Sequence, residues 1–75
     1  MTPAQCRAAR ALVSLSQDDL AKSSNVAKAT IAAFELGPRQ PYPRTLDAIR
    51  AALEAAGVIF TEQNGNGPGV ALRKD

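Results

Sequence analysis

Helix start and stop signals follow one another so closely along residues 2–57 that this part of the chain can form only short helices. Thr2, followed by Pro, and Ser16, followed by two Asp within three residues, are typical helix starts. A hydroxyl caps the first turn, Pro fits its backbone, and acids suit the helix dipole. Asn25 tolerates a left-handed turn, and Gly37 before Pro ends a helix. The sequence therefore predicts a mainly α fold with four helices. They cover about Thr2–Leu15, Ser16 to the Ser23–Asn25 stretch, Ala27–Leu36 and Pro43–Ala56.

Apolar residues in the first and fourth predicted helices recur at the spacing of one helical face. They are Cys6, Ala9 and Val13, with Leu12 beside them, in the first helix, and Leu46, Ile49, Leu53 and Ala56 in the fourth. Of the 34 hydrophobic residues 15 are Ala, so only 19 side chains can fill much volume. Because so thin a core is marginal alone, we expect oligomerisation or a bound ligand to add burial.

The chain changes character after Gly57. Residues 58–61 are β-branched or aromatic, residues 63–69 are dense in turn formers, and residues 70–73 suit an extended strand. This order predicts a β-hairpin with a long or irregular loop, and the alternative is a disordered linker. We therefore expect one helical domain in residues 1–57 and a hairpin or extended tail in residues 58–75.

Composition excludes several classes of site. A single Cys6 cannot form an internal disulfide, and with no His the chain lacks any usual zinc ligand set, so no metal or other cofactor is expected. Scattered acids and the absence of His also argue against an enzyme. No export signal and no apolar run of about 18 residues is visible, so we expect a cytoplasmic protein without a membrane partner. Residues 1–44 hold six basic and three acidic residues, a balance that suits a polyanion.

The second and third predicted helices, joined by a three- or four-residue turn, fit the description of a helix-turn-helix. Over about residues 5–56 the chain resembles the phage-repressor type, the Cro/repressor or xenobiotic-response-element family of regulators. The resemblance implies a compact four-helix DNA-binding domain and a transcriptional repressor or activator. It rests on Ser16 to Ala21, Asn25 and Val26, Thr30 and Ile31, Phe34 and Glu35, Gly37, Arg39 and Pro41.

A small core is expected to fix the angle between these two helices, with a small residue where their backbones approach. Its members are Leu20, Ala21, Val26, Ile31 and Phe34. Without that angle the third helix could not protrude. The core is therefore a condition for recognition.

The third helix is expected to enter the DNA major groove, which is about 12 Å wide and is read by residues near the inserted N-terminus. Lys28 and Ala29 lie there, and Ala32 and Ala33 follow one turn later. Lys28 can donate to guanine O6 and N7, and an Ala methyl can touch a thymine methyl. The alternative to base contact is that Lys28 is a solvated surface lysine. With four Ala in the helix, we expect DNA shape and phosphate contacts to matter.

The resemblance also implies contacts to the DNA backbone. Gln17 is expected to contact a phosphate and to brace the recognition helix, and Arg39 to contact the backbone from the following loop. Arg44 extends that contact in this interpretation, although a charge near a helix start is also common without a ligand. Thr30 can offer its hydroxyl to a phosphate.

By the same resemblance Arg10 and Glu35 form a structural ion pair between the first and third helices. Cys6 is interpreted as a small core residue. The chain departs from the family pattern at Asn25, where Gly is usual, and at Ala27, where Ser or Thr usually caps the recognition helix. We expect that uncapped N-terminus to fray in the free protein and to become ordered on DNA.

Two modes of action are open. A homodimer formed through the tail would bind a palindromic operator, with recognition helices about 34 Å apart. The alternative is an antitoxin-like or adaptor protein whose tail binds a partner protein, because the apolar strand around Val58–Phe60 could pair with another chain.

Overall fold

Local capping interactions define where the first two helices begin. A computed structural model describes residues 1–37, 40–61 and 67–74. In this structure Thr2 Oγ1 accepts from the Gln5 backbone N–H at 3.0 Å, and Gln5 Oε1 accepts in return from the Thr2 backbone N–H at 2.8 Å. Ser16 and Asp19 form the same reciprocal pair before the second helix. These boxes satisfy backbone donors that a helix start leaves unpaired.

Left-handed residues end the first three helices. Ser14 (φ 57°), Asn25 (φ 59°) and Gly37 (φ 94°) occupy this conformation, as expected for Asn25 and Gly37. The predicted order of four helices and a hairpin is confirmed, with ends shifted by a few residues at most. The elements are α1 (Pro3–Val13), α2 (Gln17–Ser24), α3 (Lys28–Leu36), α4 (Pro43–Ala55), β1 (Val58–Thr61) and β2 (Gly69–Leu72).

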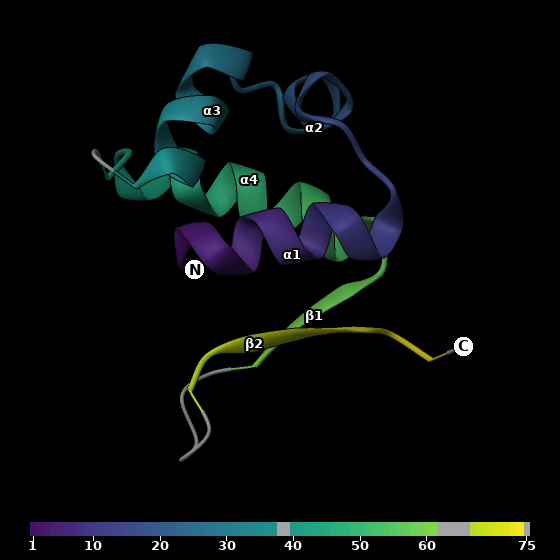
Figure 1. Cartoon of the computed structure of the whole chain (residues 1–75). Coiled ribbons are helices and arrows are strands. Elements are labelled where there is room, and N and C mark those ends of the chain that lie inside the picture. The colour runs from purple at the N-terminus through teal and green to yellow at the C-terminus, as the bar shows by residue number, and fades with distance from the viewer. Residues whose placement is uncertain (38–39, 62–66, 75) are drawn as a thin grey trace.

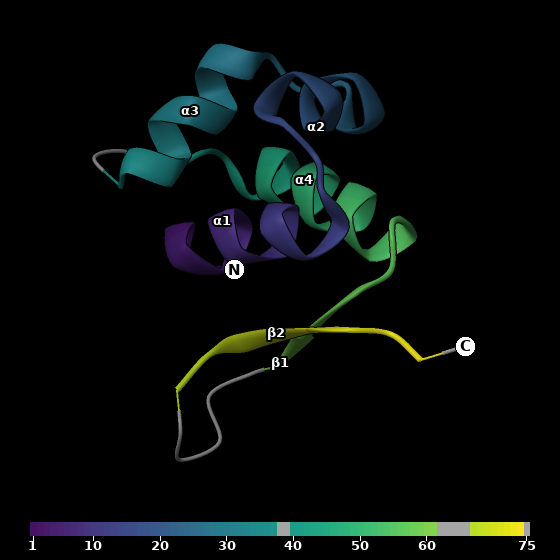
Figure 2. The ribbon, with the colours of Figure 1, turned by 45° about the vertical axis from the view of Figure 1, so that its right-hand side comes forward.

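The elements stack in three tiers (Figure 1). Helices α2 and α3 form one outer tier, α1 and α4 lie side by side in the middle, and the hairpin lies against α1 on the other side (Figures 1 and 2). Helix α2 contacts α3 and α4, whereas α1 contacts α3, α4 and both strands. The hairpin therefore lies on the opposite side of the molecule from α2 and α3.

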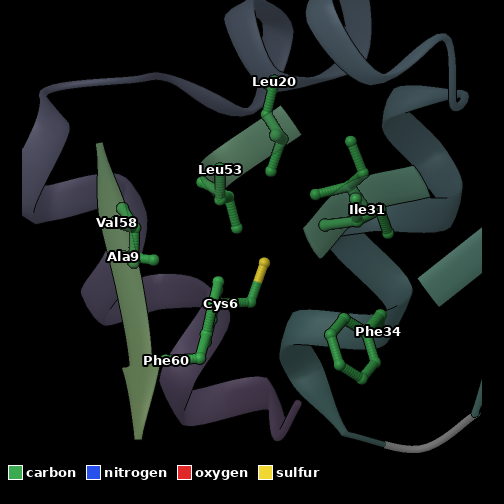
Figure 3. Close-up of a cluster of buried hydrophobic side chains, with 9 residues drawn as sticks. Cys6, Ala9, Leu20, Ile31, Phe34, Leu53, Val58 and Phe60 are labelled. Carbon is green, nitrogen blue, oxygen red and sulfur yellow. The ribbon is translucent and has the colours of Figure 1, made fainter. Parts of the chain in front are cut away.

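One buried cluster joins all of these tiers, and its side chains converge between the helices and β1 (Figure 3). It contains Cys6, Ala9, Leu20, Ile31, Phe34, Ile49, Leu53, Val58 and Phe60. The small core expected between the recognition helices is present, with Ala21 and Val26 partly buried at its margin. Two sequence expectations were wrong: Leu12 is exposed because it lies off the Cys6–Ala9 face, and Ala56 is an exposed cap residue beyond α4.

The tail forms the antiparallel hairpin rather than the disordered alternative in its described residues. Val58 pairs with Leu72 and Phe60 with Val70, and burial alternates along β1 so that Val58 and Phe60 enter the core. Gln5 of α1 donates from Nε2 to two hairpin carbonyls, 2.9 Å from Gly69 and 3.3 Å from Thr61. The expected irregular loop, residues 62–66, lies outside the described residues.

Candidate nucleic-acid interface

Helix α3 buries one face and exposes the other. Ile31 and Phe34 point into the core, whereas Lys28 and Ala29 at its N-terminus are exposed. Thr30, Ala32 and Ala33 are partly buried beside them. Lys28 and Ala29, two of the residues expected to read bases, thus lie on the outer, N-terminal part of the helix, and Ala33 follows one turn later.

Glu35 holds the buried end of α3 against α1 and α2. Its carboxylate accepts from Arg10 at 2.7 Å and 2.8 Å, from Gln17 Nε2 at 2.9 Å, and from the Cys6 thiol at 3.1 Å. The ion pair expected between Arg10 and Glu35 is formed, and Gln17 occupies the bracing position. Side chains of α1 and α2 donate these four hydrogen bonds, so the carboxylate ties α3 to both helices.

Burial and hydrogen bonding shift the pKa values of this cluster in opposite directions. Burial of Glu35 raises its pKa, but bonds donated by Arg10, Gln17 and Cys6 outweigh burial and bring the pKa to about 2. Burial, followed by the bond to Glu35, raises the pKa of Cys6 to about 12. The pKa of Arg10 is raised, first through its hydrogen bond to Glu35. The carboxylate is therefore ionised and the thiol neutral at neutral pH.

Arg7 is a positioning residue that the sequence interpretation missed. It donates from Nη1 to the backbone carbonyl of Glu35, near the C-terminal end of α3, where a cation suits the helix dipole. Arg10 also donates to the carbonyl of Leu15 at 3.1 Å. The spacing of three residues between the two arginines was the available signal, because it places both on one side of α1.

Lys28 is paired with Asp18, a contact that sequence reasoning did not predict. Its Nζ lies 3.3 Å from Oδ1 and 3.4 Å from Oδ2 of Asp18. The two side chains belong to the first turns of α3 and α2, and both are more than half exposed. A lysine here is therefore a donor whose charge is partly balanced by a neighbouring acid.

Two grooves, each of about 550 Å³, flank the exposed face of α3. The first contains three of the predicted site residues together with polar side chains that the sequence interpretation missed. It is lined by Ala29, Thr30, Ala33, Phe34, Gln40, Pro41, Tyr42 and Thr45. The second is lined by Arg7, Arg10, Gln17, Ala32, Glu35 and Leu36. Arg44 is exposed in the first turn of α4, beside Thr45, and Arg39 lies outside the described residues.

The comparison with protein families agrees with this geometry. A family model described as Helix-turn-helix matches residues 7–55, more than half of the chain. The chain belongs to this helix-turn-helix family. The resemblance to phage-repressor regulators is thereby confirmed, and the protein is a member of a DNA-binding family rather than an enzyme family. The match runs from residue 7, within α1, to the end of α4 and stops before the hairpin.

No similar protein was found among the curated proteins. Within residues 1–37, 40–61 and 67–74, no helix has both the length and the apolar character needed to cross a bilayer.

Proposed function

We propose that this helix-turn-helix protein is a sequence-specific transcriptional regulator that inserts α3 into the major groove, in the cytoplasm. The observation that carries the proposal is the exposed N-terminus of α3, with Lys28 and Ala29 outermost, on a helix whose other face is anchored by Ile31, Phe34 and the Glu35 cluster. A helix that is exposed on one face and anchored by the other suits a groove that accepts one α-helix. Lys28 would read guanine, and Ala29 and Ala33 would contact thymine methyl groups.

Contacts to phosphate would fix the register of α3 on the duplex. A glutamine amide nitrogen carries two N–H groups, and Gln17 gives one of them to Glu35, so the second suits a phosphate oxygen. On the other flank we propose phosphate contacts from three residues. They are Thr30, which lines the first groove, Arg44, which is exposed near the start of α4, and Arg39.

Binding to DNA from immediately upstream of the protein's own gene tests this proposal. Fluorescence anisotropy would compare that duplex with a scrambled one at two salt concentrations. A preference of about 10³-fold or more is expected for a specific regulator. Lys28→Ala should remove roughly 1–3 kcal/mol at one base position, whereas Arg44→Ala should weaken all sequences and reduce the salt slope by about one. Weak, equal and strongly salt-dependent binding would reject sequence-specific regulation.

The hairpin is proposed to join two copies into a homodimer on a palindromic operator, with residues 1–57 as the DNA-binding part. Ile59 and Leu72 support this, because these apolar residues are 43% and 52% exposed, respectively. Sedimentation at micromolar concentration should give the dimer mass. Ile59→Lys should give the monomer, whereas Ala55→Lys, which adds the same charge on exposed α4, should not. A monomer mass for the unmodified chain would exclude the dimer.

The same exposed residues favour one second candidate, an antitoxin-like or adaptor role in which the hairpin binds a partner protein. The comparison of Lys28→Ala with Ile59→Lys separates the two. If the protein reads DNA, Lys28→Ala should lose more operator binding than Ile59→Lys. An unmodified chain that forms the dimer but does not bind the operator would favour the adaptor.

A further inference from the structure

The ion pair between Asp18 and Lys28 has little to do with folding. Its side chains are 65% and 55% exposed, and an ion pair this exposed adds little to stability. Yet the ammonium lies almost equally far from both carboxylate oxygens, at 3.3 Å and 3.4 Å. The pair therefore presents a donor and an acceptor side by side at the start of the recognition helix.

Electrostatics explain why the pair forms. The N-terminus of α3 carries the positive end of the helix dipole, begins with the cation of Lys28, and has no acid in its first turn. Ala27 offers no capping oxygen. Asp18 supplies the missing negative charge from α2, whereas its neighbour Asp19 is occupied at the α2 cap by the backbone N–H of Ser16.

The spacing of this pair matches the central groups of a G·C base pair. Guanine O6 accepts and cytosine N4 donates in the major groove, and these atoms are about 2.9 Å apart because a Watson–Crick hydrogen bond joins them. The Lys28 nitrogen and the nearer Asp18 oxygen are 3.3 Å apart. A donor and an acceptor at that spacing can address both bases of the pair at once.

We propose that Asp18 is a second base-reading residue, which accepts from cytosine N4 while Lys28 donates to O6 and N7 of the paired guanine. This inference rests on the proposed function, because it requires α3 to lie in the major groove. Asp18 would also disfavour other base pairs, because in a C·G or A·T pair its carboxylate would face an acceptor oxygen. A T·A pair offers O4 and N6 in the right order, but it places the thymine methyl where Lys28 would meet guanine N7.

Selection from duplexes with a randomised 20-base-pair segment tests this assignment, using the full chain, Asp18→Ala and Asp47→Ala. The matched control removes an exposed carboxylate from α4, outside α2 and α3. The unmodified chain should select G·C at one position of each site. Asp18→Ala should reduce that preference about tenfold or more. It should also bind random duplex more tightly, with a salt slope larger by about one, as Lys28 turns to phosphate. Asp47→Ala should keep the full preference.

A double-mutant cycle adds a second readout. If Asp18 and Lys28 read one base pair, the double Ala variant should lose little more preference than the more damaged single variant. Unchanged preference in Asp18→Ala, or losses at two separate positions, would overturn the inference while leaving sequence-specific binding intact. An unmodified chain that selects no sequence at all would reject the proposed function and this inference together.

Discussion

At the scale of single residues, Glu35 links α3 to α1 and α2. It is buried on α3 and accepts four hydrogen bonds from Arg10, Gln17 and Cys6. A buried charge is tolerated only when it is paired and fully hydrogen-bonded. Losing this carboxylate would therefore leave Arg10 and Gln17 without their acceptor and free the end of α3.

Stability should depend on pH through Glu35. Its pKa is about 2 in the folded chain and 4.5 ordinarily, so its contribution is full above about pH 5 and is lost as pH falls from 4.5 through 2. That contribution is roughly 3 kcal/mol by linkage. In urea unfolding series, Glu35→Gln should be less stable by about that amount at pH 7, and the difference should nearly vanish near pH 2.

Glu54→Gln is the control, because Glu54 belongs to an exposed pair with Arg50 and should change stability by less than about 0.5 kcal/mol. An identical pH dependence in Glu35→Gln and the unmodified chain would contradict this role of Glu35.

Cys6 should be chemically inert in the folded protein. It is fully buried, and burial together with the bond to Glu35 raises its pKa to about 12, so thiolate is scarce. Labelling by a disulfide reagent at pH 8 should be slower by roughly a thousandfold or more than in denaturant, because it requires opening of the structure. Fast labelling without denaturant would show that α1 opens locally.

At the scale of elements, α3 differs from α1 and α2 in how it starts. The first two helices have reciprocal capping boxes, whereas Ala27 precedes α3 with no capping side chain, as the sequence indicated. The Ala27 backbone carbonyl accepts hydrogen bonds from the backbone N–H groups of Thr30 and Ile31. The element proposed to read DNA thus starts without the side-chain cap that α1 and α2 have.

Restoring the cap should stabilise the protein. Ala27 has an extended ψ of 138°, near the conformation that a capping residue takes, so Ala27→Ser should add about 0.5–2 kcal/mol in urea unfolding. Ser16→Ala should cost a similar amount, because it removes the α2 box. A loss of stability in Ala27→Ser would mean that the start of α3 cannot accept a cap.

Amide exchange tests whether the uncapped end frays. Protection at residues 28–30 should be low in the free protein and should rise on DNA, and Ala27→Ser should raise it without DNA. Equal protection at these residues in the free and bound protein would contradict fraying.

At the scale of the whole molecule, the hairpin completes the core. Val58 and Phe60 fill the space beneath α1, Gln5 binds two hairpin carbonyls, and the Arg50 guanidinium lies 5.0 Å from the centre of the Phe60 ring. Cutting the chain at Gly57 would therefore damage the helical part as well as any dimer. A substitution at the exposed Ile59 tests the dimer without this damage.

Truncation of two neighbouring residues of β1 should destabilise the protein by very different amounts. Phe60→Ala should cost roughly 3–5 kcal/mol, a large part of the stability of a domain this size, because it opens a cavity in the core. Ile59→Ala, on the outward face, should cost less than about 1 kcal/mol in the monomer. Urea midpoints measured at low protein concentration would check both, and equal losses would contradict the inward role of Phe60.

Local signals in the sequence were enough to predict the helices, the turns and the family. Caps and turn residues act within a few positions, so Ser16, Asn25 and Gly37 could be interpreted locally, and the spacing of apolar residues identified most of the core. The pairing of Arg10 with Glu35 followed from family resemblance. Where periodicity failed, Leu12 lies off the Cys6–Ala9 face of α1, and Ala56 lies beyond the end of α4 as its cap residue.

Which side chains far apart in the sequence meet became visible only in the folded chain. Gln5 reaches residues 56 and 64 positions away, and Asp18 meets Lys28 because the turn at Asn25 brings two helix starts together. Such contacts depend on the angles between packed helices, which no local pattern encodes. The scaffold of this helix-turn-helix protein is thus evident in its sequence, whereas the donor and acceptor pattern that it presents to DNA is set by its packing.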